Sequence, residues 1–323
     1  MSYGSYHEMI AAFWALYREE AWADALGLLV REGDSFPDEA AHVLYLRSCV
    51  AARSGQPEVA VRVLAGALER GLWYGEGLMR ASPSWQSLQG RADFEGMVEI
   101  CREREKAATA AASPALLVET PDDTASGPSA APVLVAVHGN GDHAKAALAG
   151  WRPLVAHGWA VAAVQSSQVS GPERFGWFDQ ALAVREIEEL VASLGARPAI
   201  DRGRTIIAGF QLGGEPALRV ALRHRVQARG FVLIDPFGPA TPPAEEWAAL
   251  AAARPVSGLR GSILLADHAL HLSHDLPRGI AAALTARGVS CDIGSEPGLG
   301  YDYPPDPWPA FSRALAHIEA PGA

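Results

Sequence analysis

The residue types best placed for chemistry surround a Gly-x-x-x-Gly-Gly turn. Residues 205–218 start as an apolar run, pass Gly209, Gly213 and Gly214, and continue as an amphipathic helix. Such a strand-turn-helix segment usually presents a nucleophile at the middle of its turn. Here that position is Gln211, and an amide side chain cannot attack an acyl carbon as Ser, Cys or Asp can. The sequence therefore predicts the backbone of a nucleophile site without the nucleophile.

Short apolar segments alternate with helical patterns after residue 132, which favours a mostly parallel sheet covered by helices on both faces. The predicted strands are 133–137, 160–164, 205–208, 231–234, 262–266 and 290–293. The predicted helices are 144–156, 178–194, 214–224, 275–287 and 307–318. Ligands of such sheets bind beyond the carboxyl ends of the strands. The loops where a site is expected therefore begin at His138, Gln165, Gln211, Asp235, Asp267 and Gly294.

Residues 5–107 have the period of helices, with apolar positions three and four residues apart. The predicted helices are 7–17, 22–30, 39–52, 57–69 and 93–104. Residues 25–29 resemble residues 60–64 at an offset of 35, close to the period of a tetratricopeptide helix pair. An ordinary helical cap remains the alternative. From residue 106 the composition shifts to Ala, Ser, Thr, Pro and Asp, which predicts a helix end, a linker, a strand near 115–119 and a turn at 121–129. We expect a helical, tetratricopeptide-like domain at 1–110 and a second domain at 114–323.

The composition excludes several function classes. The 323 residues carry a formal net charge of −10, which disfavours nucleic acid or an anionic membrane surface as the main partner. Cys49, Cys101 and Cys291 lie far apart and lack the spacing of metal ligands. The N-terminus lacks the basic start and apolar core of a signal peptide, and no apolar run is long enough to span a membrane. We expect a cytoplasmic protein without a cofactor or a metal.

Four segments, in the expected order, resemble the α/β-hydrolase superfamily, particularly its carboxylesterase and phospholipase-like branch. Residues 135–142 (Val-Ala-Val-His-Gly-Asn-Gly-Asp) resemble its oxyanion loop, and residues 175–179 (Phe-Gly-Trp-Phe-Asp) its aromatic-Asp segment. Residues 209–214 resemble the elbow Gly-x-Ser-x-Gly-Gly, and residues 297–305 the late loop Gly-His-x-Tyr-Pro. The resemblance covers about residues 114–319. It implies an α/β-hydrolase fold preceded by an all-α, helical-repeat-like domain.

The departures from this family fall on the catalytic positions. Gln211 stands where the resemblance implies Ser, and Tyr301 where it implies His. The implied acid position is Ala269, although Asp267 would serve if its turn were shifted by two residues. A Ser-His-Asp relay needs all three groups, so at most one survives. Gln211, Tyr301, Asp267 and His138 remain the candidate catalytic residues, His138 more as a brace of the oxyanion loop.

The resemblance also implies an oxyanion hole and a pocket. The backbone N–H groups of Asn140 and Leu212 would form the hole. The turn glycines are required either by that function or by the turn geometry alone, and the sequence favours neither. The candidate pocket residues are Asp142, Trp177, Phe178, Phe237, His268 and Asp302. A metal on the nearby histidines 268, 271 and 274 is not expected.

Three hypotheses of function follow. The first is a diverged enzyme that uses the oxyanion hole and a polar cavity on a small carbonyl compound, as a lyase, isomerase, cyclase or water-based hydrolase. The second is an inactive binding or scaffold protein whose helical domain presents a surface to a protein partner. The third is an esterase with a relocated nucleophile, for which Ser166, Ser167 and Ser170 are the candidates. The sequence does not identify the substrate, the oligomeric state or the pathway.

Overall fold

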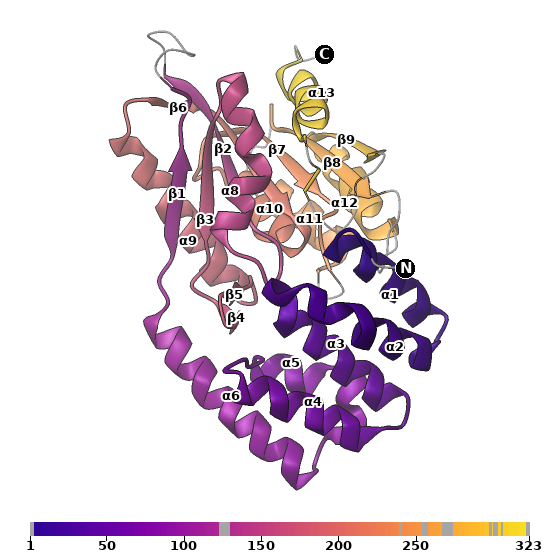
Figure 1. Ribbon diagram of the computed structural model, residues 1–323. Helices are drawn as coiled ribbons and strands as arrows, with labels where there is room; N and C mark the ends of the chain where they lie inside the picture. The colour runs from indigo at the N-terminus through magenta and orange to yellow at the C-terminus, as the bar shows by residue number, and fades with distance from the viewer. Residues whose placement is uncertain are drawn as a thin grey trace. The chain divides into compact units, whose positions relative to one another are not determined.

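The computed structural model describes residues 3–122, 130–238, 241–253, 258–266, 274–296, 299, 303–304 and 306–320, except the side chain of residue 7. The chain divides into two compact units (Figure 1). One comprises Met1–Ala112 and Val169–Pro172, and the other comprises Ser113–Gln168 and Glu173–Ala323. The second unit carries the segments singled out by the sequence.

The first unit is helical. Its helices are α1 (Tyr6–Arg18), α2 (Trp22–Glu32), α3 (Ala40–Arg53), α4 (Pro57–Glu69), α5 (Glu76–Ala81) and α6 (Ala92–Ala111), with 3₁₀ turns at Gly33–Ser35, Pro37–Glu39 and Pro83–Leu88. Helices α1 to α4 pack in succession, each against the next. The five predicted helices are confirmed, whereas α5 and the turn before α6 are too short to show a period. The tetratricopeptide likeness stays a prediction.

Buried aromatic side chains form the core of this unit. Trp85 is fully buried, packs edge-on against Tyr45 and Phe94, and donates from Nε1 to the Ser48 hydroxyl at 3.0 Å. Because a buried indole N–H without a partner would lose its hydration, Ser48 stabilises the Trp85 position. The Ser48 hydroxyl in turn donates to the Ala60 carbonyl, which ties α3 to α4.

The second unit contains a seven-stranded sheet in the order β1-β3-β2-β6-β7-β8-β9. Its strands are β1 (Ala115–Glu119), β2 (Ala131–Val137), β3 (Ala160–Gln165), β6 (Ile200–Phe210), β7 (Ala228–Ile234), β8 (Arg260–Ala266) and β9 (Ser290–Glu296). Strand β1 is antiparallel to β3, and every other described pair in this sheet is parallel. The predicted strands and the mostly parallel sheet are confirmed. A short pair, β4 (Val169–Gly171) and β5 (Arg174–Phe175), was not predicted.

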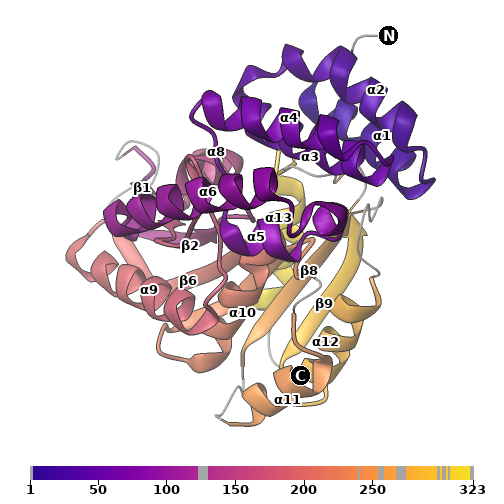
Figure 2. The ribbon, with the colours of Figure 1, turned by 90° about the horizontal axis from the view of Figure 1, so that it is seen from below.

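Helices cover both faces of the sheet because its strands are apolar on both sides. Val133, Val135 and Val137 belong to one buried cluster, and the intervening Leu134 and Ala136 belong to another. The first cluster includes residues of α9 (Gln180–Ser193), α10 (Gly214–Arg223), α11 (Ala244–Ala252) and α12 (Asp275–Thr285). The second includes residues of α8 (Ala144–Trp151) and α13 (Trp308–Glu319). Figure 2 shows α9, α10 and α12 along one face of the sheet.

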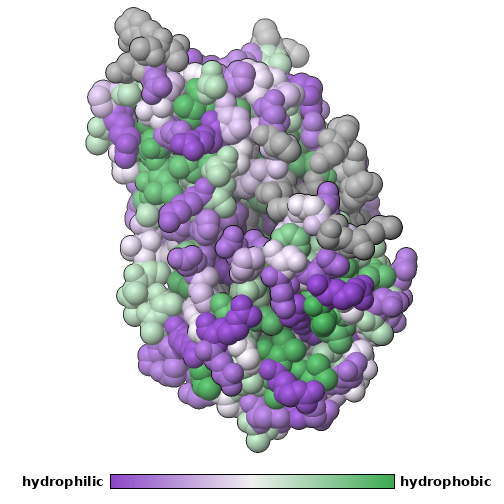
Figure 3. All heavy atoms as spheres, viewed as in Figure 1, coloured by the Kyte–Doolittle hydropathy of each residue, from purple (hydrophilic) through white to green (hydrophobic). Residues whose placement is uncertain are grey.

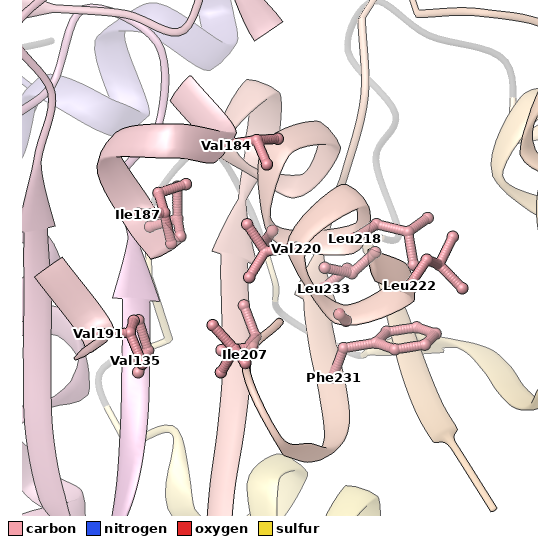
Figure 4. Packing of buried hydrophobic residues seen from close by; sticks show 14 of the residues in the cluster. Val135, Val184, Ile187, Val191, Ile207, Leu218, Val220, Leu222, Phe231 and Leu233 are labelled. Atoms are coloured by element: carbon pink, nitrogen blue, oxygen red, sulfur yellow. The ribbon is translucent and has the colours of Figure 1, made fainter. Parts of the chain in front are cut away.

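The first cluster holds the strand and helix that flank the turn at Gln211. Figure 4 shows Ile207 of β6 and Phe231 and Leu233 of β7 facing Leu218 and Val220 of α10. All five side chains are fully buried. Burial of each is worth roughly 1.5–3 kcal/mol relative to an exposed side chain. The turn at Gln211 is therefore held at both ends by packed apolar residues.

Three differences from the predicted elements have physical reasons. Helix α6 continues to Ala111 through a run of alanines, which are the best helix formers, so the helix end predicted near residue 106 was wrong. Helix α11 was missed because its nine residues carry five alanines and little periodicity. The helix predicted from residue 178 begins at Gln180, because Asp179 caps it through a bond from the Leu182 N–H at 2.9 Å.

The surface carries scattered apolar residues. On the face shown in Figure 3, hydrophilic residues in purple lie between separate hydrophobic areas in green. The large hydrophobic side chains exposed in the described part of the chain are Val30, Leu78, Ile100 and Phe178. Single exposed apolar residues of this kind are normal in globular proteins. Among the described residues, no helix is long and apolar enough to cross a membrane.

Candidate active site

The turn after β6 contains a strained residue. Gln211 follows the extended Phe210 and has φ +46°, in the left-handed region, before α10 starts at Gly214. A residue with a Cβ loses roughly 1–2 kcal/mol in that conformation. The Gln211 carbonyl accepts a hydrogen bond from the Phe237 N–H at 3.2 Å. The strained residue is thus fixed to the loop that follows the neighbouring strand β7.

Each of the three turn glycines has a packing reason of its own. A Cβ on Gly213 would lie 2.2 Å from the His138 carbonyl oxygen, and one on Gly214 would lie 2.6 Å from Cβ of Pro236. A Cβ on Gly209 would lie 2.6 Å from the Gly213 carbonyl oxygen. Backbone packing alone therefore requires these glycines. Of the two interpretations left open by the sequence, turn geometry is sufficient, and the glycines carry no separate argument for function.

The Gln211 amide lies against the loop that follows β2. Its Oε1 atom is 3.1 Å from the place where a Cβ on Gly139 would stand, and the residue is partly buried. An amide offers an acceptor oxygen and two N–H donors. Gln211 therefore brings donors and an acceptor to the position where a hydroxyl nucleophile would otherwise point.

His138 braces the start of this loop. It is fully buried, Nδ1 donates to the Gly139 carbonyl at 2.8 Å, and Nε2 accepts the Ser166 N–H at 3.4 Å. Its ring packs on Trp177, whose Nε1 donates to the His138 carbonyl at 2.9 Å. Burial lowers the pKa of His138 from 6.5 to about 4. The imidazole is therefore neutral near pH 7, with both nitrogens engaged by the backbone.

The rest of the loop is fixed by a short bridge. The Gly141 N–H donates to the Phe175 carbonyl at 2.8 Å, and the Phe175 N–H donates to the Asp142 carbonyl at 3.1 Å. Gly141 has φ +68°, which only glycine adopts without strain. The Asp142 carboxylate accepts the His143 N–H at 2.7 Å. The exposed Asn140 thus lies between two anchored residues, Gly139 and Gly141.

Asp235, directly after β7, is a titratable residue that sequence reasoning did not select. The sequence indicated it only as the start of a loop, and its position after a buried strand was the available signal. It has φ +43°, and its N–H donates to the Leu264 carbonyl at 2.7 Å. Burial raises the pKa of the Asp235 carboxyl, against a bond from the Ala266 N–H and the charge of His274, which lower it.

A buried ion pair holds the loop after β7. Glu215, in the first turn of α10, accepts two bonds from the Arg219 guanidinium, at 3.1 and 2.9 Å. Its other oxygen accepts the Thr241 hydroxyl at 3.2 Å, and that hydroxyl accepts the Gly238 N–H. The Arg219 guanidinium lies 4.8 Å from the centre of the Trp247 ring. Glu215, in the first turn of α10, therefore positions this loop.

Comparisons with known proteins agree with this architecture. Residues 5–109 match the family model described as "A/B hydrolase-like, N-terminal domain". A crystal structure of an uncharacterized protein from Bacillus cereus ATCC 10987 aligns over 99% of each chain, with 21% identity and a TM-score of 0.51. The chain therefore has an α/β-hydrolase fold preceded by a helical N-terminal domain.

More distant structures are esterases. The Bacillus cereus carboxylesterase aligns with 59% of this chain and 89% of its own, at 15% identity and a TM-score of 0.44. Esterase PE8 aligns with 64% of this chain and 99% of its own, at 17% identity and a TM-score of 0.49. A comparison with curated protein sequences found no match.

The predicted site residues of this α/β-hydrolase fold separate into three groups. Gln211, Leu212, Asn140, His138 and Asp142 follow β6 and β2, which are neighbours in the sheet. The predicted pocket residues Trp177 and Phe237 are 4% and 2% exposed and belong to the core, whereas Phe178 is 60% exposed. The predicted residues outside the described part of the chain are Tyr301, Asp267, His268 and Asp302.

Two of the serines considered as a relocated nucleophile have hydroxyls that bond to other groups of the chain. The Ser166 hydroxyl is buried and donates to the Gly176 carbonyl at 2.7 Å. The Ser167 hydroxyl donates to the buried carboxylate of Glu186. Both hydroxyls thus fasten the loop after β3. In the described ranges, no group of three His, Cys, Asp or Glu residues is arranged to hold a metal ion.

Proposed function

We propose that this chain is a diverged α/β-hydrolase-fold enzyme that acts on a small carbonyl compound without forming an acyl-enzyme. The observation that carries the proposal is Gln211, a side chain kept at φ +46° with its amide against the loop after β2. Glycine would relieve the strain at this position. Strained residues cluster at active sites, where their side chains are needed.

The proposed chemistry uses backbone donors and the Gln211 amide. The N–H groups of Asn140 and Leu212 would stabilise the oxygen of the carbonyl as negative charge develops on it. The Gln211 amide would hold the substrate or a water molecule beside the carbonyl carbon. Attack by Gln211 itself is excluded, because an amide is not a nucleophile at neutral pH. The attacking group is therefore water or a second group of the substrate.

The experiment measures turnover of p-nitrophenyl acetate and binding of methylphosphonate, a tetrahedral anion that resembles the charged intermediate. We expect steady turnover without an initial burst, and no labelling by a fluorophosphonate. Gln211→Ala should lower turnover about 10²-fold, the size of the loss when a reacting group is displaced from its position. It should also weaken methylphosphonate binding at least about tenfold, which is about 1.4 kcal/mol.

Gln227→Ala is the matched control, because Gln227 is exposed in a loop of the same unit. It should leave both measurements unchanged. A burst with fluorophosphonate labelling would contradict the proposal and indicate a serine nucleophile. Absence of both turnover and methylphosphonate binding in the unaltered chain would favour an inactive binding or scaffold protein, whose partner would be sought on the helical unit.

A further inference from the structure

Phe178 is an exposed aromatic residue on a fixed piece of backbone. At 60%, it is the most exposed large hydrophobic residue in the described part of the chain. The Asp179 N–H donates to Oε1 of Gln168 at 2.7 Å, and the Asp179 carbonyl accepts Nε2 of the same side chain at 3.1 Å. The Trp177 carbonyl accepts Nε2 of Gln180 at 2.7 Å. The backbone on both sides of Phe178 is thus held in place, which distinguishes it from the single exposed apolar residues common on proteins.

Gly176 fixes the direction of the Phe178 ring. A Cβ on Gly176 would lie 2.4 Å from Cζ of the ring, and 2.8 and 2.9 Å from the adjoining carbons Cε2 and Cε1. The end of the ring therefore fills the space that a side chain at position 176 would need. Gly176 is itself anchored, because its N–H donates to the Gln168 carbonyl at 2.9 Å and its carbonyl accepts the Ser166 hydroxyl at 2.7 Å. A rigid aromatic ring with few rotatable bonds offers a large contact surface at a low entropy cost.

The segment before Phe178 runs antiparallel to the loop after β2. Phe175 pairs with Asp142 across an antiparallel bridge. Two residues further along, the Trp177 ring lies 4.7 Å from that of His138, and its Nε1 donates to the His138 carbonyl at 2.9 Å. The segment and the loop therefore contact each other at both ends of the loop.

These contacts bring the Phe178 ring near Asn140, whose N–H is the proposed donor to the carbonyl oxygen. Gly139 and Asn140 lie between the two contacts on the loop, and Gly176 lies between them on the segment. Residues opposite each other in an antiparallel pair have Cα atoms about 4.5–5.5 Å apart. The Gln211 amide approaches the same loop, with Oε1 3.1 Å from the place of a Cβ on Gly139. The loop that carries Asn140 therefore has both the Gln211 amide and the Phe178 ring as neighbours.

The exposed face of Phe178 suits a flat ring better than an alkyl chain. The other exposed large hydrophobic residues in the described part of the chain, Val30, Leu78 and Ile100, all belong to the helical unit. An alkyl chain is removed from water only where apolar walls enclose it. A flat ring can bury a whole face against one other ring, and the quadrupoles of the two rings favour offset or edge-on contact.

We propose that Phe178 is a specificity-determining residue that stacks on an aromatic ring of the substrate. The inference rests on the proposed function and names its substrate class as small carbonyl compounds that carry an aryl group. The Asn140 N–H and the Gln211 amide hold the carbonyl end, and the aryl group lies on the exposed face of Phe178. Because the aryl group takes no part in the reaction, the contact stabilises the bound substrate and the transition state equally. It therefore lowers KM without changing kcat.

The first test compares phenylphosphonate with methylphosphonate, two tetrahedral anions that differ in the aromatic ring. Phenylphosphonate should bind the unaltered chain at least about tenfold more tightly, which is about 1.4 kcal/mol. Phe178→Ala should abolish this difference and leave the affinity for methylphosphonate unchanged. Phe178→Tyr keeps the ring and should keep the difference, whereas Phe178→Leu keeps only the apolar bulk and should lose most of it. Ile100→Ala, at a residue of α6 that is 45% exposed, is the control and should change neither affinity.

The second test measures turnover of p-nitrophenyl acetate, whose leaving group is an aromatic ring. Phe178→Ala should raise KM at least about tenfold and leave kcat unchanged. The thermal midpoint should stay that of the unaltered chain, because the side chain is exposed. A lowered kcat together with a lowered midpoint would show that Phe178 supports the fold of the loop and would overturn the proposal.

The binding results separate this inference from the proposed function. Equal affinity of the unaltered chain for the two phosphonates, or a difference that survives in Phe178→Ala, would overturn the role of Phe178 and leave the proposed function standing. A difference kept in Phe178→Leu would overturn the aryl class, because apolar bulk alone would then account for it. An unaltered chain that binds neither phosphonate and does not turn over the ester would refute the proposed function, and this inference with it.

Discussion

Replacing Gln211 by glycine should make the protein more stable, although glycine usually destabilises. The left-handed φ of +46° costs a residue with a Cβ roughly 1–2 kcal/mol. Glycine avoids this penalty but adds about 0.4–1 kcal/mol of conformational entropy to the unfolded chain. Gln211→Gly should therefore unfold with a free energy about 0.5–1 kcal/mol higher than that of Gln211→Ala, which keeps the strain.

The measurement is urea unfolding of the two variants beside a matched pair at Gln227. Gln227 is exposed in the same unit and is not among the residues with positive φ. There the order should reverse, with Gln227→Gly about 0.4–1 kcal/mol less stable than Gln227→Ala. If glycine is no better than alanine at 211 while the pair at 227 behaves as expected, Gln211 is not strained. The backbone at Gln211 would then give no support to a retained site.

Three further outcomes are expected in the same unit. Burial lowers the pKa of His138 from 6.5 to about 4, so the folded chain keeps this side chain neutral. The free energy of unfolding should therefore fall by up to about 3 kcal/mol as the pH decreases from about 6.5 to about 4. His138→Asn should remove this dependence in acid unfolding curves. Gly213→Ala should prevent folding or destabilise the protein by more than about 4 kcal/mol, because the added Cβ would lie 2.2 Å from a backbone oxygen. Gly279→Ala, within α12, should instead stabilise the protein by up to about 1 kcal/mol. Thermal midpoints measure both effects. Thr241→Val should cost about 1–3 kcal/mol, because it deprives Glu215 of a hydroxyl donor, and hydrogen exchange of the Gly238 amide should increase.

The fold was largely predictable because periodicity and turn residues carry most of its information. The apolar run before Gly209 and the glycines after it predicted both the strand and the tight turn, and the structure adds which atoms each glycine must avoid. The prediction failed where a segment lacks a period. Five of the nine residues of α11 are alanine, and the alanines after residue 106 extended α6 where a change of composition suggested a linker.

The site was less predictable than the fold because its distinctive features are three-dimensional. Asp235 has nothing in its neighbouring sequence that marks it, and it becomes a candidate only through its φ, its burial and the charge of His274. Conversely, Trp177 and Phe237 have the residue types of a pocket wall, but the structure buries them. Residue type alone therefore selects aromatic candidates too readily and overlooks a buried carboxyl at the end of a strand.

A working site differs from an unused one because it keeps residues that destabilise the folded state and make no packing contacts that offset this cost. The turn glycines do not qualify, since the backbone needs them in either case. Gln211 has a strained φ, which glycine would adopt without strain. Asp235 has a buried carboxyl, and the amide of asparagine would fit the same place without a charge. Both residues lie at neighbouring strand ends, and at each of them the native side chain carries a cost to folding that glycine or asparagine would remove. Stabilising substitutions are common in proteins, and when they fall in an active site they often reduce activity. Two such residues side by side therefore support the proposed reaction at this edge of the sheet.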